Sequence, residues 1–157
     1  MLGAPTFDLA FIDGLHLWEQ ALRDFIHLER FARPDSVVML HDCLPLDEVS
    51  AERVRTTHFY SGDVWKLAAC LRRHRPELAM VTVRAGPTGL TLVTGLQPSS
   101  EKLASGFDGL VAEYAAIGFA DYERHPEWMP ESIGNLPQEV ESWLLSRTQV
   151  FAPGPKP

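Results

Sequence analysis

Residues 7–43 read FDLAFIDGLHLWEQALRDFIHLERFARPDSVVMLHDC, and this stretch decides the fold. An apolar run at 7–13 ends in an acid, an amphipathic pattern covers 17–32, and a second apolar run ends in His41-Asp42. Strand, helix and strand in this order predict a βαβ unit with parallel strands and a right-handed crossover. The carboxyl ends of both strands then meet at one edge of the sheet, where open α/β sheets place their sites.

The elements of this unit follow from simple patterns. Phe7–Asp13 is apolar on both faces through its middle, which is typical of a parallel strand covered by helices on both sides. Apolar residues then recur at the three- and four-residue steps of a surface helix between 17 and 32. Pro34 ends that helix, because the residue before a proline avoids helical geometry. A turn at Asp35-Ser36 leads into the strand Val37–Leu40.

The remaining chain divides into two expected parts. Residues 1–98 form the α/β part, in which the strands 79–84 and 90–94 are joined by a Gly-Pro-Thr-Gly turn as an antiparallel hairpin. Residues 99–157 form a helical and irregular extension, with helices at 102–117 and 137–148 and a frayed tail at Phe151–Pro157.

Composition excludes several classes of protein. Net charge is −7 and no basic stripe is present, which argues against a nucleic-acid partner. No apolar run approaches the length of a membrane span, and the first residues, MLGAPTFD, lack a signal peptide. Two cysteines form no disulfide framework, so a reducing compartment is the default. We therefore expect a cytoplasmic protein without a membrane partner.

Four spaced motifs carry a family resemblance that runs from about Phe7 to Pro98. They are FIDGLH at 11–16, ARPDSVVMLHD at 32–42, GDVWKLAACLRRHRPEL at 62–78 and GPTGLTLVTGLQP at 86–98. Together they resemble the class I S-adenosylmethionine-dependent methyltransferases of the type called methyltransferase domain 24. The resemblance implies a partial Rossmann-like sheet, with parallel strands, a C-terminal antiparallel hairpin, helices on both faces and a C-terminal helical extension.

The resemblance also implies a function, S-adenosylmethionine-dependent methyl transfer to the hydroxyl of a small molecule. Two departures limit it. Leu15 stands where the family usually has an acid, and no G-x-G-x-G follows any strand. Residues 1–98 thus resemble only the C-terminal half of a methyltransferase domain, and the cofactor-binding residues stay unassigned. The alternative is a non-catalytic remnant or an interaction module on the same scaffold.

Asp13 and Asp42 are the first candidate site residues, because they end successive parallel strands. Paired carboxylates suit a hard cation such as Mg²⁺, and metal-dependent O-methyltransferases place acidic ligands at similar positions. His41 stands where those enzymes often have a second acid, so a softer ion is expected if His41 is a ligand. In the alternative interpretation, both acids cap strand ends by accepting hydrogen bonds from backbone amides.

His16 is the candidate catalytic base. In catechol-type and macrolide-sugar O-methyltransferases, the residue three positions after the corresponding Asp is a Lys or His that takes the proton of the acceptor hydroxyl. An imidazole suits this task at neutral pH. The alternative is a histidine at a helix start with no chemistry. Trp128 and Met129 are candidates for an acceptor pocket or for an exposed interface.

The Phe7–Asp13 strand also predicts association with another chain. In the complete methyltransferase fold this strand is internal, whereas here one of its sides would be a bare apolar edge. Such edges pair with other chains. We therefore expect a homo-oligomer, or a partner chain, joined through this strand.

Overall fold

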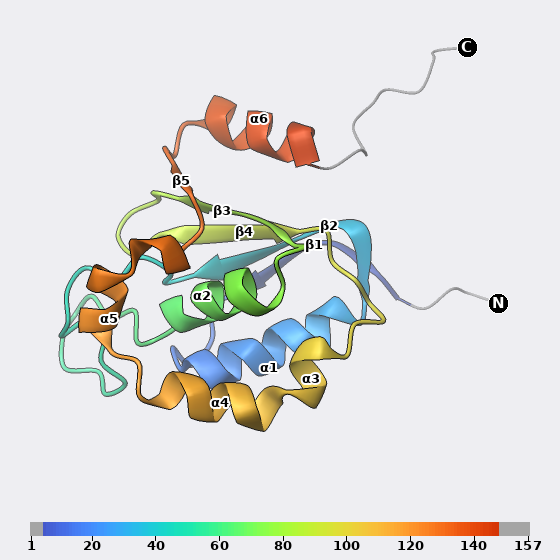
Figure 1. Cartoon of the computed structure of the whole chain (residues 1–157). Helices are drawn as coiled ribbons and strands as arrows, with labels where there is room; N and C mark the ends of the chain where they lie inside the picture. Colours follow the sequence, from blue (N-terminus) through green and yellow to red (C-terminus); the bar gives the residue numbers. More distant parts are fainter. Residues whose placement is uncertain (1–4, 148–157) are drawn as a thin grey trace, which may run out of the picture.

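Five strands form one mixed sheet in the order β1-β2-β4-β3-β5 (Figure 1). The computed structural model describes residues 5–147, so the tail predicted at Phe151–Pro157 lies outside the described residues. β1 (Phe7–Ile12) and β2 (Ala32–His41) are parallel, and α1 (Trp18–Glu29) connects them. This is the predicted βαβ unit.

The predicted hairpin is also present, and its second strand is inserted into the sheet. β4 (Leu90–Thr94) lies between β2 and β3 (Ala79–Val83) and runs antiparallel to both. This reversed strand beside its neighbour, combined with the parallel pair β1-β2, confirms the predicted α/β class with a partial Rossmann-like sheet.

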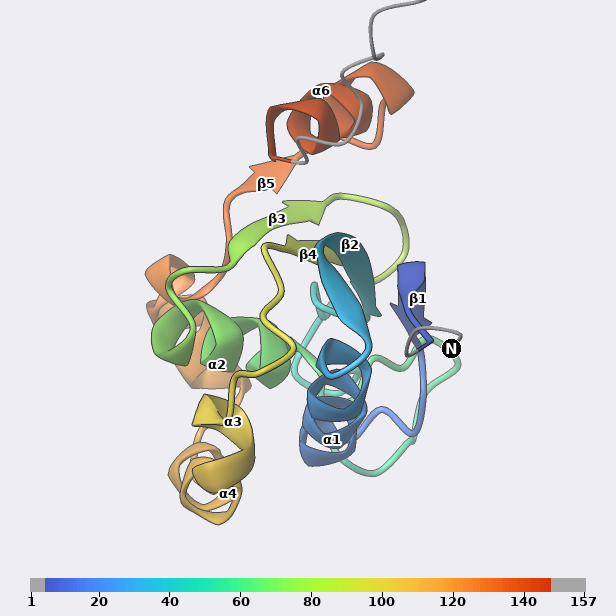
Figure 2. The same ribbon diagram turned by 90° about the vertical axis from the view of Figure 1, so that its right-hand side faces the viewer.

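Helices cover the two faces of the sheet unequally. On one face lie α1, α2 (Trp65–His74), α3 (Lys102–Ser105) and α4 (Phe107–Ala115), while α6 (Pro137–Arg147) lies on the other (Figures 1 and 2). α5 (Phe119–Arg124) and a short 3₁₀ helix (Pro126–Trp128) connect α4 to β5 (Ser132–Ile133). No helix within residues 5–147 is long and apolar enough to cross a membrane.

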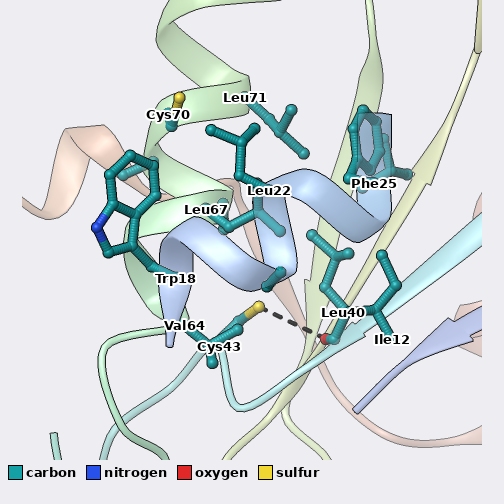
Figure 3. Close-up of a cluster of buried hydrophobic side chains, with 14 of the residues drawn as sticks. Ile12, Trp18, Leu22, Phe25, Leu40, Cys43, Val64, Leu67, Cys70 and Leu71 are labelled. Atoms are coloured by element: carbon teal, nitrogen blue, oxygen red, sulfur yellow. Dashed lines mark hydrogen bonds between the residues drawn. The ribbon is translucent and has the colours of Figure 1, made fainter. Parts of the chain in front are cut away.

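The main core fills the space between α1, α2 and the sheet. Its large buried side chains from the two helices and β2 interlock, as Figure 3 shows for Trp18, Leu22, Phe25, Leu40 and Leu67. A smaller cluster on the opposite face joins Val81, Val83 and Leu92 to side chains of α6. The second face is therefore covered mainly over β3 and β4.

Several predicted boundaries were wrong. β2 begins at Ala32, so Asp35-Ser36 lie within a strand and not in a turn. Ser36 explains the extension, because its hydroxyl accepts a bond from the Arg33 amide and donates to the carbonyl of Phe7 on β1. The predicted helix at 102–117 breaks at Gly106, and β5 was not foreseen.

The prediction that β1 is covered on both faces was also wrong. β1 is an edge strand, and the side chains of Leu9 and Phe11 are 56% and 53% exposed. Ala10 and Ile12 alternate with them and pack into the main core. The reason is that α6 packs beside β3 and leaves the same face open over β1 (Figure 2).

A buried ion pair ties α1 to the end of α2. The Arg75 side chain is fully buried and donates two hydrogen bonds of 2.8 Å to the Glu29 carboxylate. Glu29 also accepts the backbone amide of Gln97 at 3.1 Å. The bidentate geometry satisfies both charges within the protein.

Replacing Arg75 by Leu will destabilise the fold strongly, because it leaves the buried carboxyl group of Glu29 without its ion-pair partner. We expect a loss of about 3–5 kcal/mol in the free energy of unfolding, measured by urea denaturation. Arg73 is the matched control, since its pair with Glu113 is 63% exposed on the arginine side. Arg73→Leu should cost less than about 1 kcal/mol. Equal losses for the two variants would show that the buried ion pair stabilises the fold no more than the exposed one does.

Candidate functional site

Asp13 and Asp42 lie close together at the ends of β1 and β2, as expected from the sequence. Asp13 follows β1, His41 is the last residue of β2, and Asp42 follows His41. His41 Nδ1 lies 3.6 Å from Asp13 Oδ1 and 3.2 Å from Asp42 Oδ2. Asp42 is buried, whereas Asp13 is 41% exposed and His41 is 31% exposed, so the cluster opens toward solvent on the β1 side.

His16 joins the same cluster from the turn between β1 and α1. Its Nδ1 lies 3.1 Å from Asp42 Oδ2, and its Nε2 lies 3.7 Å from Asp13 Oδ1. The sequence separated His16, as a base, from the metal set Asp13, His41 and Asp42. The structure places all four side chains in one site, in which both histidines face the same oxygen of Asp42.

Two of these residues have strained backbones. His16 and Asp42 have φ angles of +55° and +62°, in the left-handed region that costs other residues than glycine on the order of 1–3 kcal/mol. The loop before α2 packs closely against His16, since a Cβ on Gly62 would lie 2.0 Å from the His16 carbonyl oxygen. Tyr60 stacks on the His16 ring with centroids 5.2 Å apart. Strain held by surrounding contacts is typical of functional sites.

Asp42 is oriented by a residue that the sequence analysis did not assign to the site. The hydroxyl of Thr88 donates a hydrogen bond of 2.5 Å to Asp42 Oδ1, and both side chains are buried. The Leu44 amide donates to the Thr88 carbonyl at 2.6 Å, which fastens the β3–β4 turn to the end of β2. Asp42 Oδ1 therefore has a hydrogen-bond donor, and Asp42 Oδ2 faces the two histidines. The sequence motif GPTGL at 86–90, which contains Thr88, is the signal that could have assigned this residue to the site.

The site offers nitrogen and oxygen donors at a spacing that is compatible with a divalent cation. The Nδ1 atoms of His16 and His41 are buried and make no hydrogen bond, although each lies within ion-pair distance of Asp42 Oδ2. One ligand atom from each of Asp13, His16 and Asp42 lies within 4.8 Å of the others. Two ligands on a tetrahedral ion such as Zn²⁺ are about 3.4 Å apart. Imidazole donors favour softer ions such as Zn²⁺ over Mg²⁺.

The motif GDVWK supports the site from the neighbouring helix. The buried Asp63 carboxylate accepts the Trp18 amide at 3.0 Å and therefore satisfies the start of α1 directly after the His16 turn. Asp63 is balanced by Arg53 at 2.7 Å and by the buried Lys66 at 3.2 Å. Trp65 is buried in the core and has a packing role.

Other candidates lie apart from this cluster. Trp128 lines a cavity of about 250 Å³ together with residues of α2 and α4, and none of the four site residues lines it. Met129 is buried in the main core. Cys43 is also buried, and burial raises the pKa of its thiol to about 12, so it is not an activated nucleophile.

One family model matches the part of the chain that carries this site. Residues 2–43 match the family model described as a methyltransferase domain. This stretch is similar to the class I S-adenosylmethionine-dependent methyltransferases. The match covers β1, α1 and β2 and includes all four residues of the cluster. No curated protein and no solved structure matches the chain.

Replacing Thr88 by Val will remove the hydroxyl that holds Asp42 Oδ1. A buried carboxylate then loses a hydrogen bond, which should cost about 1–3 kcal/mol in the free energy of unfolding. Thr88→Ser keeps the hydroxyl and is the matched control, for which we expect a smaller loss. Urea unfolding of the three proteins measures the difference. If Val is tolerated as well as Ser, Thr88 does not hold Asp42.

Proposed function

We propose that this chain carries the acceptor side of an O-methyltransferase site, with the hydroxyl of a small molecule as the methyl acceptor. The observation that supports it is the convergence of Asp13, His16, His41 and Asp42 at the carboxyl edge of β1 and β2. This edge is where α/β sheets bind ligands. The four residues belong to the stretch that is similar to methyltransferases.

His16 is the base in this proposal. Its Nδ1 faces the buried Asp42, while its Nε2 lies on the side of the more exposed Asp13. Nε2 takes the proton from the acceptor hydroxyl, and the oxygen gains the electron density needed to attack a methyl carbon. Asp42 stabilises the imidazolium that results, and Tyr60 restricts the ring by stacking on it. Positioning by these neighbours supplies part of the acceleration.

A divalent ion is part of the proposal because the donor set fits one. Asp13, His41 and Asp42 would hold it, and His16 then stays available as the base. When bound, such an ion lowers the cost of deprotonating a hydroxyl that it contacts. The imidazole of His41 in this ligand set favours a softer ion such as Zn²⁺ over Mg²⁺.

S-adenosylmethionine is the methyl donor that the family suggests. The described residues do not fit its amino-acid and ribose parts. Those parts need a glycine-rich turn between a strand and a helix, and the β1–α1 turn at 13–17 holds a single glycine, Gly14. What residues 5–147 supply is the set of groups that acts on the acceptor.

Zn²⁺ should raise the melting temperature of the untagged chain, because an ion that binds only the folded state stabilises it. We expect a rise of roughly 5–10 °C at 100-fold excess over the dissociation constant, with a smaller rise for Mg²⁺. Asp42→Asn and His41→Ala should abolish the shift. His27→Ala, which removes an exposed histidine of α1, should leave it unchanged. A full shift in Asp42→Asn would contradict the metal site.

The residues that the structure describes also predict a negative result with the donor. Titration of the chain with S-adenosylmethionine, followed by calorimetry, should give no heat of binding at micromolar affinity. The physical reason is the missing glycine-rich turn, without which the charged and ribose groups lose most of their hydrogen bonds. Micromolar binding would contradict the assignment of an acceptor-side site alone.

A further inference from the structure

The outer edge of β1 is built for pairing with another strand. β1 is the first strand of the sheet, and no strand within residues 5–147 pairs with its outer side. Its six residues, FDLAFI, contain no proline and no lysine, which are the residues that usually protect an edge. A register shift between Phe7 and Leu9 interrupts only the beginning of the strand.

The side chains of this edge are apolar where they meet solvent. Leu9 and Phe11 lie on the same face of β1 and are 56% and 53% exposed. A cleft of about 420 Å³ lies between the end of β1 and α1, lined by Phe11–Gly14, Asp24, His27 and Leu28. An unpaired edge, exposed apolar side chains and an adjacent cleft occur together along one strand.

We propose that β1 pairs antiparallel with β1 of a second copy of this chain, across a twofold axis at Ala10. This register places Leu9 opposite Phe11 of the second copy, and Phe11 opposite its Leu9. Directly opposed residues on one face of an antiparallel pair contact each other, so both exposed apolar side chains of each copy become covered. The small side chain of Ala10 lets the two strands approach at the axis. The two sheets then join into one.

Charge is compatible with this register. Asp8 lies opposite Ile12 and Asp13 lies opposite Phe7, so no carboxylate faces another. Asp8 is paired within its own chain with Arg33. A twofold axis at Asp8, by contrast, would bring the two Asp8 side chains together. The axis at Ala10 therefore pairs Leu9 with Phe11 and opposes no like charges.

The exposed area indicates how strong the dimer is. Leu9 and Phe11 each expose roughly 100 Å², which is roughly 400 Å² of apolar side-chain surface over two copies. Standard stable interfaces bury about 1,200–2,000 Å² in total, so the dimer is weak and depends on concentration. Phe7 of the second copy lies beside Asp13 in this register. The second copy thus borders the open side of the candidate site, although the proposal does not depend on the function of that site.

Sedimentation equilibrium over micromolar to millimolar concentrations tests the pairing. The weight-average mass should rise from 17.6 kDa toward twice this value. Leu9→Lys and Phe11→Lys should each keep the chain monomeric, since a charge is placed against an apolar partner. Leu145→Lys is the matched control, because Leu145 lies on α6 and is 52% exposed. A monomer at every concentration, or equal effects of Phe11→Lys and Leu145→Lys, would overturn the proposal.

A cysteine at the axis tests the register. Cα atoms opposed across an antiparallel pair lie about 4.5–5.5 Å apart, which is within the range that a disulfide spans. Ala10→Cys should therefore give a disulfide-linked dimer under mild oxidation, whereas Leu145→Cys should not. The native thiols of Cys43 and Cys70 are buried, so the wild type should remain unlinked. Equal cross-linking of the two variants would overturn the register.

Discussion

The buried carboxylate of Asp42 is the constraint on which the candidate site depends. A carboxylate out of contact with water is costly unless its oxygens are paired. Thr88 donates to one oxygen, and the imidazoles of His16 and His41 face the other. Three segments far apart in the sequence must therefore meet at this residue. The positive φ angles of Asp42 and His16 show that the backbone bends to allow it.

The topology of the sheet makes this meeting possible. Because β4 is inserted between β2 and β3, the turn before β4 lies directly beside the carboxyl end of β2. That turn carries Thr88. The loop before α2 closes the site from the side of α1, where Gly62 leaves room for the His16 carbonyl and Asp63 satisfies the first amide of the helix. The family motifs thus surround one carboxylate.

The same βαβ unit carries both the site and the open edge. Ala10 and Ile12 of β1 pack toward α1. Leu9 and Phe11 lie on the opposite face of the sheet, which α6 covers mainly over β3 and β4 and leaves open over β1. Asp13 directly follows this strand. Its side chain is more exposed than those of Asp42 and His16, which lie beside it in the site. Pairing along β1 and chemistry at its end are therefore adjacent in space.

The sequence alone determined the βαβ unit, the hairpin and the edge at which Asp13 and Asp42 meet, because these follow from local periodicity and from the direction of parallel strands. It missed the start of β2, the break at Gly106 and the strand β5, which depend on partners distant in the chain. Only the tertiary structure decided that His16 and His41 share one oxygen of Asp42, that Thr88 holds the other, and that one face of β1 is left uncovered. Hydrogen bonds to a buried charge and the unequal coverage of a sheet are non-local, so no pattern in 7–43 encodes them.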